Sequence, residues 1–323
     1  MPLILKQIPI LLAALLILVC DALADEPAWK KDCDNPNPPK LQSHEPNTVG
    51  LTFDSNDVPY LDLKFSLKYP ILHNGLYCGR TADSWGLPFL YAAGTVRFAQ
   101  YSSNDRHSSP VIGKRYNPML FGRYWLKSED NVDKYAYIDL GYAHESDGQS
   151  IDDPASYDAL RASNPDHPEF ANDFISRGWD YYNLSGKEYF VIGDVILSTY
   201  LDLKYFPTRS PPQGKTEEFN DWEVARDGKP RRSVDGITGA LKFSSKTLKV
   251  CRDFLKSCKL AAVYTTGYKD PFKYSTVRLE FTGRAWALPP VMVWWSDGYN
   301  SDLVDYFKRV RSYGFSVELR TFE

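Results

Sequence analysis

The chain has 323 residues, of which 43% are hydrophobic and 15% aromatic, enough for one large domain or two ordinary ones. Its formal net charge at pH 7 is −3, so there is no basic excess of the kind that argues for nucleic-acid binding. Beyond the N-terminal segment, no apolar run approaches the ~18 residues that a membrane-spanning helix needs. The mature chain is therefore expected to be either an exported soluble protein or a membrane β-barrel.

The N-terminal segment predicts a cleavable secretory signal peptide over residues 1–24. One early lysine precedes an unbroken apolar run over 8–20, and an A-x-A sequence ends the segment. The run is too short to span a bilayer comfortably. A lipoprotein anchored through Cys20 is the alternative, and it is less favoured because bulky Val19 precedes that cysteine.

Residues 25–46 are polar and rich in proline, which indicates an N-terminal arm. Four cysteines remain after cleavage, and an even number in an exported protein suggests two disulfides. Free buried thiols are the alternative. No C-x-x-C pair or His/Cys spacing indicates zinc. The four cysteines are Cys33, Cys78, Cys251 and Cys258.

From residue 47 to residue 323 the dominant hydrophobic period is two, as expected for β-strands. In the stretch YLDLKFSLKY, 60–69, one face reads Tyr, Asp, Lys, Ser, Lys and the other reads Leu, Leu, Phe, Leu, Tyr. Short turns and long polar loops alternate, and the strand lengths suit tilted transmembrane strands. The pattern predicts an all-β fold, a transmembrane antiparallel up-and-down β-barrel of about 12 strands. The candidate strands lie near 48–53, 59–69, 88–101, 117–126, 134–146, 177–190, 195–206, 235–245, 259–267, 274–285, 290–297 and 312–322.

A periplasmic N-terminus would put the N-terminal arm and all four cysteines on one side of the membrane. The first strand would then run outward and the second inward. Disulfide pairing is chemically permitted in the periplasm. We therefore expect the pairs Cys33–Cys78 and Cys251–Cys258, the second within a single turn.

The stretch YIDLGYAHESDGQS, 137–150, places polar groups on an apolar strand face. Residues i and i+2 of a strand point the same way, so Ile138 and Leu140 put His144 and Ser146 on the lipid side. An imidazole at that spacing can take a serine proton, and a third group would have to orient it. The H-x-S pattern alone is weak, because 107–109 also fits it.

Three ordered motifs resemble those of the outer-membrane phospholipase A family, the calcium-dependent phospholipases of Gram-negative outer membranes. They are SSPVIGKRYNPMLF (108–121), GYAHESDGQS (141–150) and SRGWD (176–180). The resemblance implies a phospholipase A1/A2 in the bacterial outer membrane that hydrolyses acyl esters of glycerophospholipids and is active as a homodimer. It also implies catalytic groups on the outside of the barrel, near the outer-leaflet edge, where phospholipid can diffuse in laterally.

Carried over by the resemblance, Ser146 is the nucleophile and His144 the general base. Asp180 stands where the family has asparagine as the third member. A carboxylate accepts from the imidazole N–H as well as an amide oxygen does, and it stabilises imidazolium better. Burying that charge beside lipid costs more unless a cation compensates. Asp180 is therefore interpreted as a functional replacement.

The resemblance also implies a Ca²⁺ ion at the dimer interface that helps to stabilise the oxyanion. Its ligands map to the backbone carbonyl of Gln149, the hydroxyl of Ser176 and Ser108 of the partner subunit, with waters completing the shell. Oxygen ligands suit such a hard cation. The backbone N–H of Gly148 matches the second oxyanion donor, and Gln149 stands where arginine is common.

Two departures from the family concern access and dimerisation. An acidic extracellular loop over 151–175 is inserted, and its Asp152 and Asp153 are candidate extra metal ligands, although solvated loop acids are the favoured interpretation. Thr95 stands where the family has a dimer-facing glutamine, whereas nearby Gln100 is matched.

Two other functions remain open at this stage. The first is an outer-membrane barrel without catalytic activity, a porin or structural protein that has lost it. The second is a soluble exported β-protein that acts as a binding module or esterase.

Overall fold

The computed structural model describes most of the chain beyond the N-terminal segment. The predicted signal peptide, most of the predicted arm, Ser108 and three of the four mature cysteines lie outside the described part. The described residues are 41–55, 59–72, 89–101, 111–128, 135–207, 209–210, 215–216, 229–245, 255, 257–285 and 288–319.

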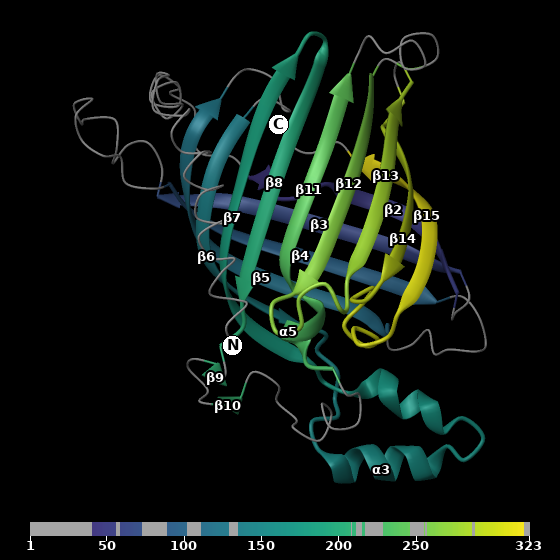
Figure 1. Cartoon of the computed structure of the whole chain (residues 1–323). Coiled ribbons are helices and arrows are strands. Elements are labelled where there is room, and N and C mark those ends of the chain that lie inside the picture. Colours follow the sequence, from purple (N-terminus) through teal and green to yellow (C-terminus); the bar gives the residue numbers. More distant parts are fainter. Residues whose placement is uncertain are drawn as a thin grey trace.

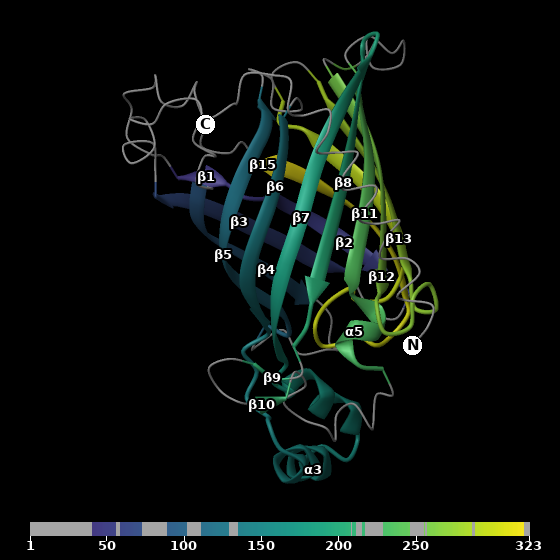
Figure 2. The same cartoon turned by 60° about the vertical axis from the view of Figure 1, so that its left-hand side comes forward.

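Twelve antiparallel strands close into one barrel, which confirms the predicted fold and strand number (Figures 1 and 2). Each strand pairs with its neighbours along the chain, and pairing between the last strand and the first closes the ring. The strands are β2 (Asn47–Asp54), β3 (Tyr60–Leu72), β4 (Phe89–Tyr101), β5 (Gly113–Ser128), β6 (Tyr135–Ser146), β7 (Gly178–Ile192), β8 (Val195–Tyr205), β11 (Gly236–Ser245), β12 (Ser257–Gly267), β13 (Thr276–Arg284), β14 (Val291–Gly298) and β15 (Val310–Leu319).

Side chains alternate between an apolar outer face and a polar lumen. On β6, Leu140 is 64% exposed on the outside, whereas Asp139 is 4% exposed on the inside. Large apolar side chains such as Phe65, Leu120 and Phe315 continue the outer belt on other strands. This distribution is the reverse of a soluble core and is typical of barrels that face lipid. No helix in the described part is long and apolar enough to cross a membrane.

The last residues of the predicted N-terminal arm belong to the sheet. A two-residue strand, β1 (Gln42–Ser43), pairs with β3 beside the start of β2. Between β1 and β2 the chain bulges into the lumen, where Glu45 forms an ion pair with Lys64 at 2.7 Å. The lumen encloses a cavity of about 740 Å³ with a largely polar and charged lining.

The 151–175 insertion, predicted as a loop, contains two helices. They are α3 (Pro154–Ser163) and the 3-10 helix η3 (Pro168–Phe174). Asp153 caps α3, because its carboxylate accepts from the backbone N–H of Ser156 at 2.9 Å. A small apolar cluster holds the two helices together, made of Ile151, Tyr157, Ala171 and Ile175.

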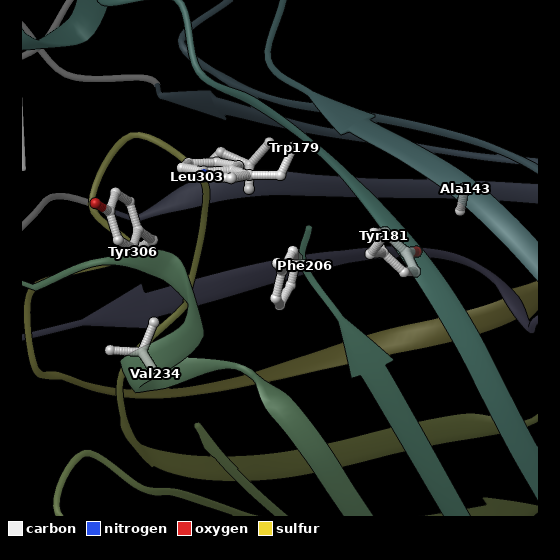
Figure 3. Close-up of a cluster of buried hydrophobic side chains, with 7 residues drawn as sticks. All are labelled: Ala143, Trp179, Tyr181, Phe206, Val234, Leu303 and Tyr306. Atoms are coloured by element: carbon white, nitrogen blue, oxygen red, sulfur yellow. The ribbon is translucent and has the colours of Figure 1, made fainter. Parts of the chain in front are cut away.

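The insertion lies at one end of the barrel, together with the short helix α5 (Arg231–Val234) (Figure 1). The two-residue strands β9 (Arg209–Ser210) and β10 (Lys215–Thr216) pair with each other in a separate small sheet. We refer to this end as the helix-bearing end. At this end a buried apolar cluster joins β6 and β7 to the loops at 229–235 and 299–309 (Figure 3). Its members are Ala143, Trp179, Tyr181, Phe206, Val234, Leu303 and Tyr306.

Buried charges in the lumen form ion pairs between neighbouring strands. We expect the loss of one partner from such a pair to lower the stability of the protein strongly. Arg123 and Asp139 are cross-strand partners joined by two hydrogen bonds of 2.7 Å. Replacing Arg123 with Met leaves a buried carboxylate uncompensated, so we expect the free energy of unfolding to fall by about 3–5 kcal/mol. Equilibrium denaturation in detergent micelles measures this.

The matched control is Arg309→Met, which breaks an ion pair between Asp297 and an arginine side chain that is 66% exposed. An exposed pair contributes about 0–1 kcal/mol. Equal losses for the two variants would contradict the claim that burial of the Arg123 pair matters.

Candidate active site

The two catalytic candidates His144 and Asp180 face each other across the β6–β7 ladder. The Nδ1 atom of His144 lies 2.8 Å from Oδ1 of Asp180. Because a carboxylate only accepts, Nδ1 carries the proton and donates. The Nε2 atom of the neutral ring is then the acceptor, which is the tautomer that a general base needs.

Ser146 lies two residues beyond His144 on the same outer face of β6. Its cross-strand neighbour on β7 is Gly178, which has no side chain to cover it. The imidazole of His144 is 36% exposed and the Asp180 side chain is 11% exposed. The register therefore brings all three predicted catalytic residues together on the outer surface of the barrel, at the helix-bearing end.

On the inner face of the same two strands, side chains of the short helix α5 and of β5 contact Glu145. Glu145, between His144 and Ser146, points into the lumen and accepts from Arg231 at 2.8 Å. Arg115 of β5 also forms an ion pair with Glu145, at 3.2 Å. The fully buried Arg231 guanidinium stacks 5.3 Å from the ring of Trp179, which is the cross-strand partner of Glu145.

Sequence reasoning missed Arg231 and Arg115. The inward parity of Glu145 indicates that the carboxylate needs a cation, but no local signal identifies one that lies 86 positions away.

The turn after Ser146 is held by the buried carboxylate of Asp147. Its Oδ1 accepts from the backbone N–H groups of Gln149 at 3.1 Å and Arg177 at 2.9 Å. Its own backbone N–H donates to the carbonyl of Arg177 at 3.0 Å. Gly148, the candidate oxyanion donor, has a φ of 61°, a left-handed conformation that glycine adopts without strain. The turn that carries Gly148 is thus tied to the start of β7.

The carboxylate of Asp147 lies in an environment that disfavours its charged form. Its side chain is completely buried, and Oδ2 has no hydrogen-bond partner. Burial raises the pKa of the Asp147 carboxyl to about 6, against the opposing effect of the backbone donors.

The candidate calcium ligands Gln149 and Ser176 lie on two segments that run side by side. Backbone bonds join these segments from Asp147 to Arg177 and from Ile151 to Phe174. The Gln149 side chain donates to the carbonyl of Ile112 at 3.3 Å, next to the segment in which Ser108 occurs. Ser108 itself lies outside the described residues.

The donor set suits a hard cation. Gln149 and Ser176 offer carbonyl and hydroxyl oxygens, the type of ligand that Ca²⁺ prefers. The described residues contain no group of three or more His, Cys, Asp or Glu arranged to hold a metal. Asp153 is occupied as the cap of α3, which supports the structural interpretation of that residue.

Thr95, at the position matched to the family's dimer-facing glutamine, points into the barrel. It is 7% exposed, and its hydroxyl lies 2.6 Å from that of Ser66.

Comparisons with known proteins show the fold. No protein-family profile matches the chain, and no curated relative matches it. The chain is similar to a solved structure of the outer membrane phospholipase (OMPLA) dimer with bound calcium from Salmonella typhi. The identity is 17%, the TM-score is 0.57, and 92% of this chain and 99% of that chain are covered.

It is also similar to an active-site mutant of outer membrane phospholipase A from Escherichia coli, at 18% identity and a TM-score of 0.54. That match covers 94% of this chain and 97% of the other. A second structure of the Escherichia coli protein matches at 17% identity and a TM-score of 0.55, covering 86% and 98%.

Asp147 should make stability depend on pH in a specific direction. The pKa of its carboxyl rises from 3.8 in the unfolded chain to about 6 in the folded protein, so the folded state binds the proton more tightly. Its contribution to stability is therefore fully present below about pH 4 and is lost as the pH rises through 6. The loss is up to about 3 kcal/mol. Denaturation at pH 4 to 7 with a chelator present measures it.

Asp147→Asn should remove this pH dependence, whereas Asp166→Asn on the exposed surface of the insertion should leave it intact. An unchanged slope in Asp147→Asn would show that Asp147 does not titrate in this range.

Proposed function

We propose that this protein is an outer-membrane phospholipase A that hydrolyses acyl esters of glycerophospholipids. The observation that carries the proposal is the 2.8 Å hydrogen bond between His144 and Asp180, with Ser146 beside them on the apolar outer face. A catalytic constellation on the outside of a barrel is accessible to a substrate dissolved in the membrane. A soluble substrate would not require that placement.

The first half of the reaction transfers the acyl group to the enzyme. The Ser146 oxygen attacks the ester carbonyl while Nε2 of His144 takes the hydroxyl proton. Asp180 holds Nδ1–H and stabilises the imidazolium that forms. The tetrahedral oxyanion accepts from the backbone N–H of Gly148. His144 then gives its proton to the leaving glycerol oxygen, and lysophospholipid departs.

The second half returns the enzyme to its starting state. Water donates a proton to His144 and attacks the acyl-serine carbonyl. The bond to Ser146 breaks, the serine oxygen recovers the proton from His144, and a fatty acid leaves.

Calcium fits as a second oxyanion stabiliser. It would be held by the carbonyl of Gln149, the hydroxyl of Ser176 and Ser108 of the partner subunit. When bound, it would supply positive charge where the oxyanion develops. Because one ligand comes from the second subunit, the active form would be a homodimer.

The membrane orientation follows from the same proposal. The helix-bearing end would face the cell exterior, with the N-terminus in the periplasm after removal of residues 1–24. Residues 25–46 would begin as a periplasmic arm, and 47–323 would form the barrel domain. Cys258 is disulfide-bonded and begins β12 at the opposite end from the helices. Cys251 is its proposed partner, and Cys33–Cys78 is the second proposed pair.

A porin is the competing function, and the apolar cluster at the helix-bearing end weighs against it. Trp179, Leu303 and Tyr306 are at most 2% exposed and pack inside this end of the barrel (Figure 3). A pore would need a continuous aqueous path through that region.

Substitution of the nucleophile tests the proposal most directly. Detergent-refolded protein should hydrolyse phospholipid, and Ser146→Ala should lose at least about 1000-fold in kcat while remaining a folded barrel. His144→Ala should lose a similar amount, because the two residues act as one unit. Asp180→Ala should also be strongly impaired, whereas Asp180→Asn should be mild because its amide oxygen still accepts from His144. Fatty-acid release from mixed micelles measures each rate.

Ser163→Ala on the exposed surface of α3 is the control and should match wild type. Appreciable activity of Ser146→Ala would refute the serine mechanism. Conductance in planar bilayers by an inactive protein would favour the porin instead.

Calcium and dimerisation should act together on activity. Neither Ser176 nor Ser108 offers a carboxylate, so each alone is a poor ligand for a hard dication. A site shared between subunits stabilises the dimer by mass action. Activity should therefore rise with calcium and with protein concentration jointly, and crosslinked dimer should increase across the same titration.

Ser108→Ala and Ser176→Ala should each raise the calcium concentration needed for half-maximal activity by about tenfold or more. A trapped monomer that hydrolyses lipid at the full rate would contradict the shared site.

A further inference from the structure

A tyrosine on the same face of β6 reaches the third member of the proposed catalytic unit. Tyr142 precedes His144 by two residues, so both side chains leave the strand in the same direction. Because Tyr142 pairs with Tyr182 and His144 pairs with Asp180, Asp180 lies diagonally across the ladder from Tyr142 on the same outer face, where the phenol interacts with the carboxylate. Asp180 thus accepts from Nδ1 of His144, and a second donor side chain of the same strand, the phenol of Tyr142, lies beside it.

The tyrosine ring is itself fixed by its neighbours. Tyr142 pairs across the ladder with Tyr182, and the ring centroids lie 5.5 Å apart at an interplanar angle of 59°. A tilted aromatic contact of this kind adds to the area buried and limits ring motion. The hydroxyl is therefore presented to Asp180 from a constrained side chain.

We infer that Tyr142 is a positioning residue for the proposed phospholipase reaction: its hydroxyl holds the Asp180 carboxylate in the orientation that aligns the imidazole of His144. The inference rests on the proposed function and adds a residue to it. Tyr142 acts through Asp180 and does not contact the reacting atoms.

The charge of Asp180 explains why a second donor matters here. The Asp180 side chain is only 11% exposed on a lipid-facing surface, so its carboxylate loses most of its hydration. His144 alone would bond one oxygen of the carboxylate. The carboxylate could then rotate so that its second oxygen accepts from a water or another donor nearby. A phenolic O–H to a carboxylate is a strong, charge-assisted hydrogen bond, and it removes that freedom.

The inference predicts coupling between Tyr142 and the charge at position 180. Asparagine at 180 presents its oxygen to His144 and an NH₂ group to Tyr142, so a phenolic donor is no longer needed there. Tyr142→Phe should lower kcat roughly tenfold in the wild-type background, with KM changed less than twofold. In the Asp180→Asn background the same substitution should change kcat less than twofold.

Tyr182→Phe is the matched control. It makes the same chemical change in the cross-strand neighbour, at the same depth in the membrane, and should leave kcat at the wild-type value. Tyr142→Phe, Tyr182→Phe, Asp180→Asn and the double variant should each unfold at a denaturant concentration similar to that of the wild type, because every aromatic ring is kept.

The double-mutant cycle separates the two proposals. If Ser146→Ala abolishes hydrolysis but Tyr142→Phe keeps the wild-type kcat, the positioning role is wrong and the serine mechanism stands. An equal loss from Tyr142→Phe in both backgrounds would also overturn the positioning role, because the hydroxyl would then act independently of Asp180. If Ser146→Ala remains active, the serine mechanism fails, and if the wild-type protein does not hydrolyse phospholipid, the proposed function itself fails. Should Tyr142→Phe not refold alone, the comparison of Asp180→Asn with Tyr142→Phe/Asp180→Asn decides: a tenfold further loss overturns the inference.

Discussion

The two-residue alternation of a closed antiparallel barrel controls most of this structure. Each strand residue faces either the outer surface or the lumen, and a slip of one residue would exchange the two faces. On β6 this constraint puts Leu140 and His144 outside while Asp139 and Glu145 lie inside. The candidate catalytic pair therefore exists because β6 and β7 are held in a single register.

That register is supported from both faces. Outside, His144 and Asp180 bond across the ladder at 2.8 Å. Inside, Arg231 of the short helix α5 donates a hydrogen bond to Glu145 and lies against the ring of Trp179, so one residue contacts both strands directly behind the pair. A buried ion pair contributes little net stability once its desolvation is counted, but removing one partner is costly. The inner network is thus better understood as a means of fixing the arrangement of β6 and β7.

The strands could be predicted from the sequence because alternation over a few residues defines each one. The spacing of His144 and Ser146 places them on one face, but their selection as catalytic candidates, with Asp180, came from the resemblance of three ordered motifs and stays a prediction. The helices of the 151–175 insertion were missed, since short helices depend on packing such as that of Tyr157 against Ile175. Arg231 was missed for a related reason: its partner Glu145 is far away in the chain and is brought near only by the folded loop.

The aspartate at position 180 shows why a motif residue cannot be assessed in isolation. A carboxylate is a better partner for imidazolium than an amide, yet it is far more costly to bury beside lipid. In this barrel β6 offers two donor side chains at consecutive outward positions: His144 bonds the carboxylate at 2.8 Å, and Tyr142 lies diagonally across the ladder from it. Neutral donors of the neighbouring strand therefore solvate this carboxylate in place of water. The aspartate is then best considered together with the whole β6–β7 pair, and in the proposed phospholipase its effect on the rate would depend on the tyrosine as well as on the aspartate.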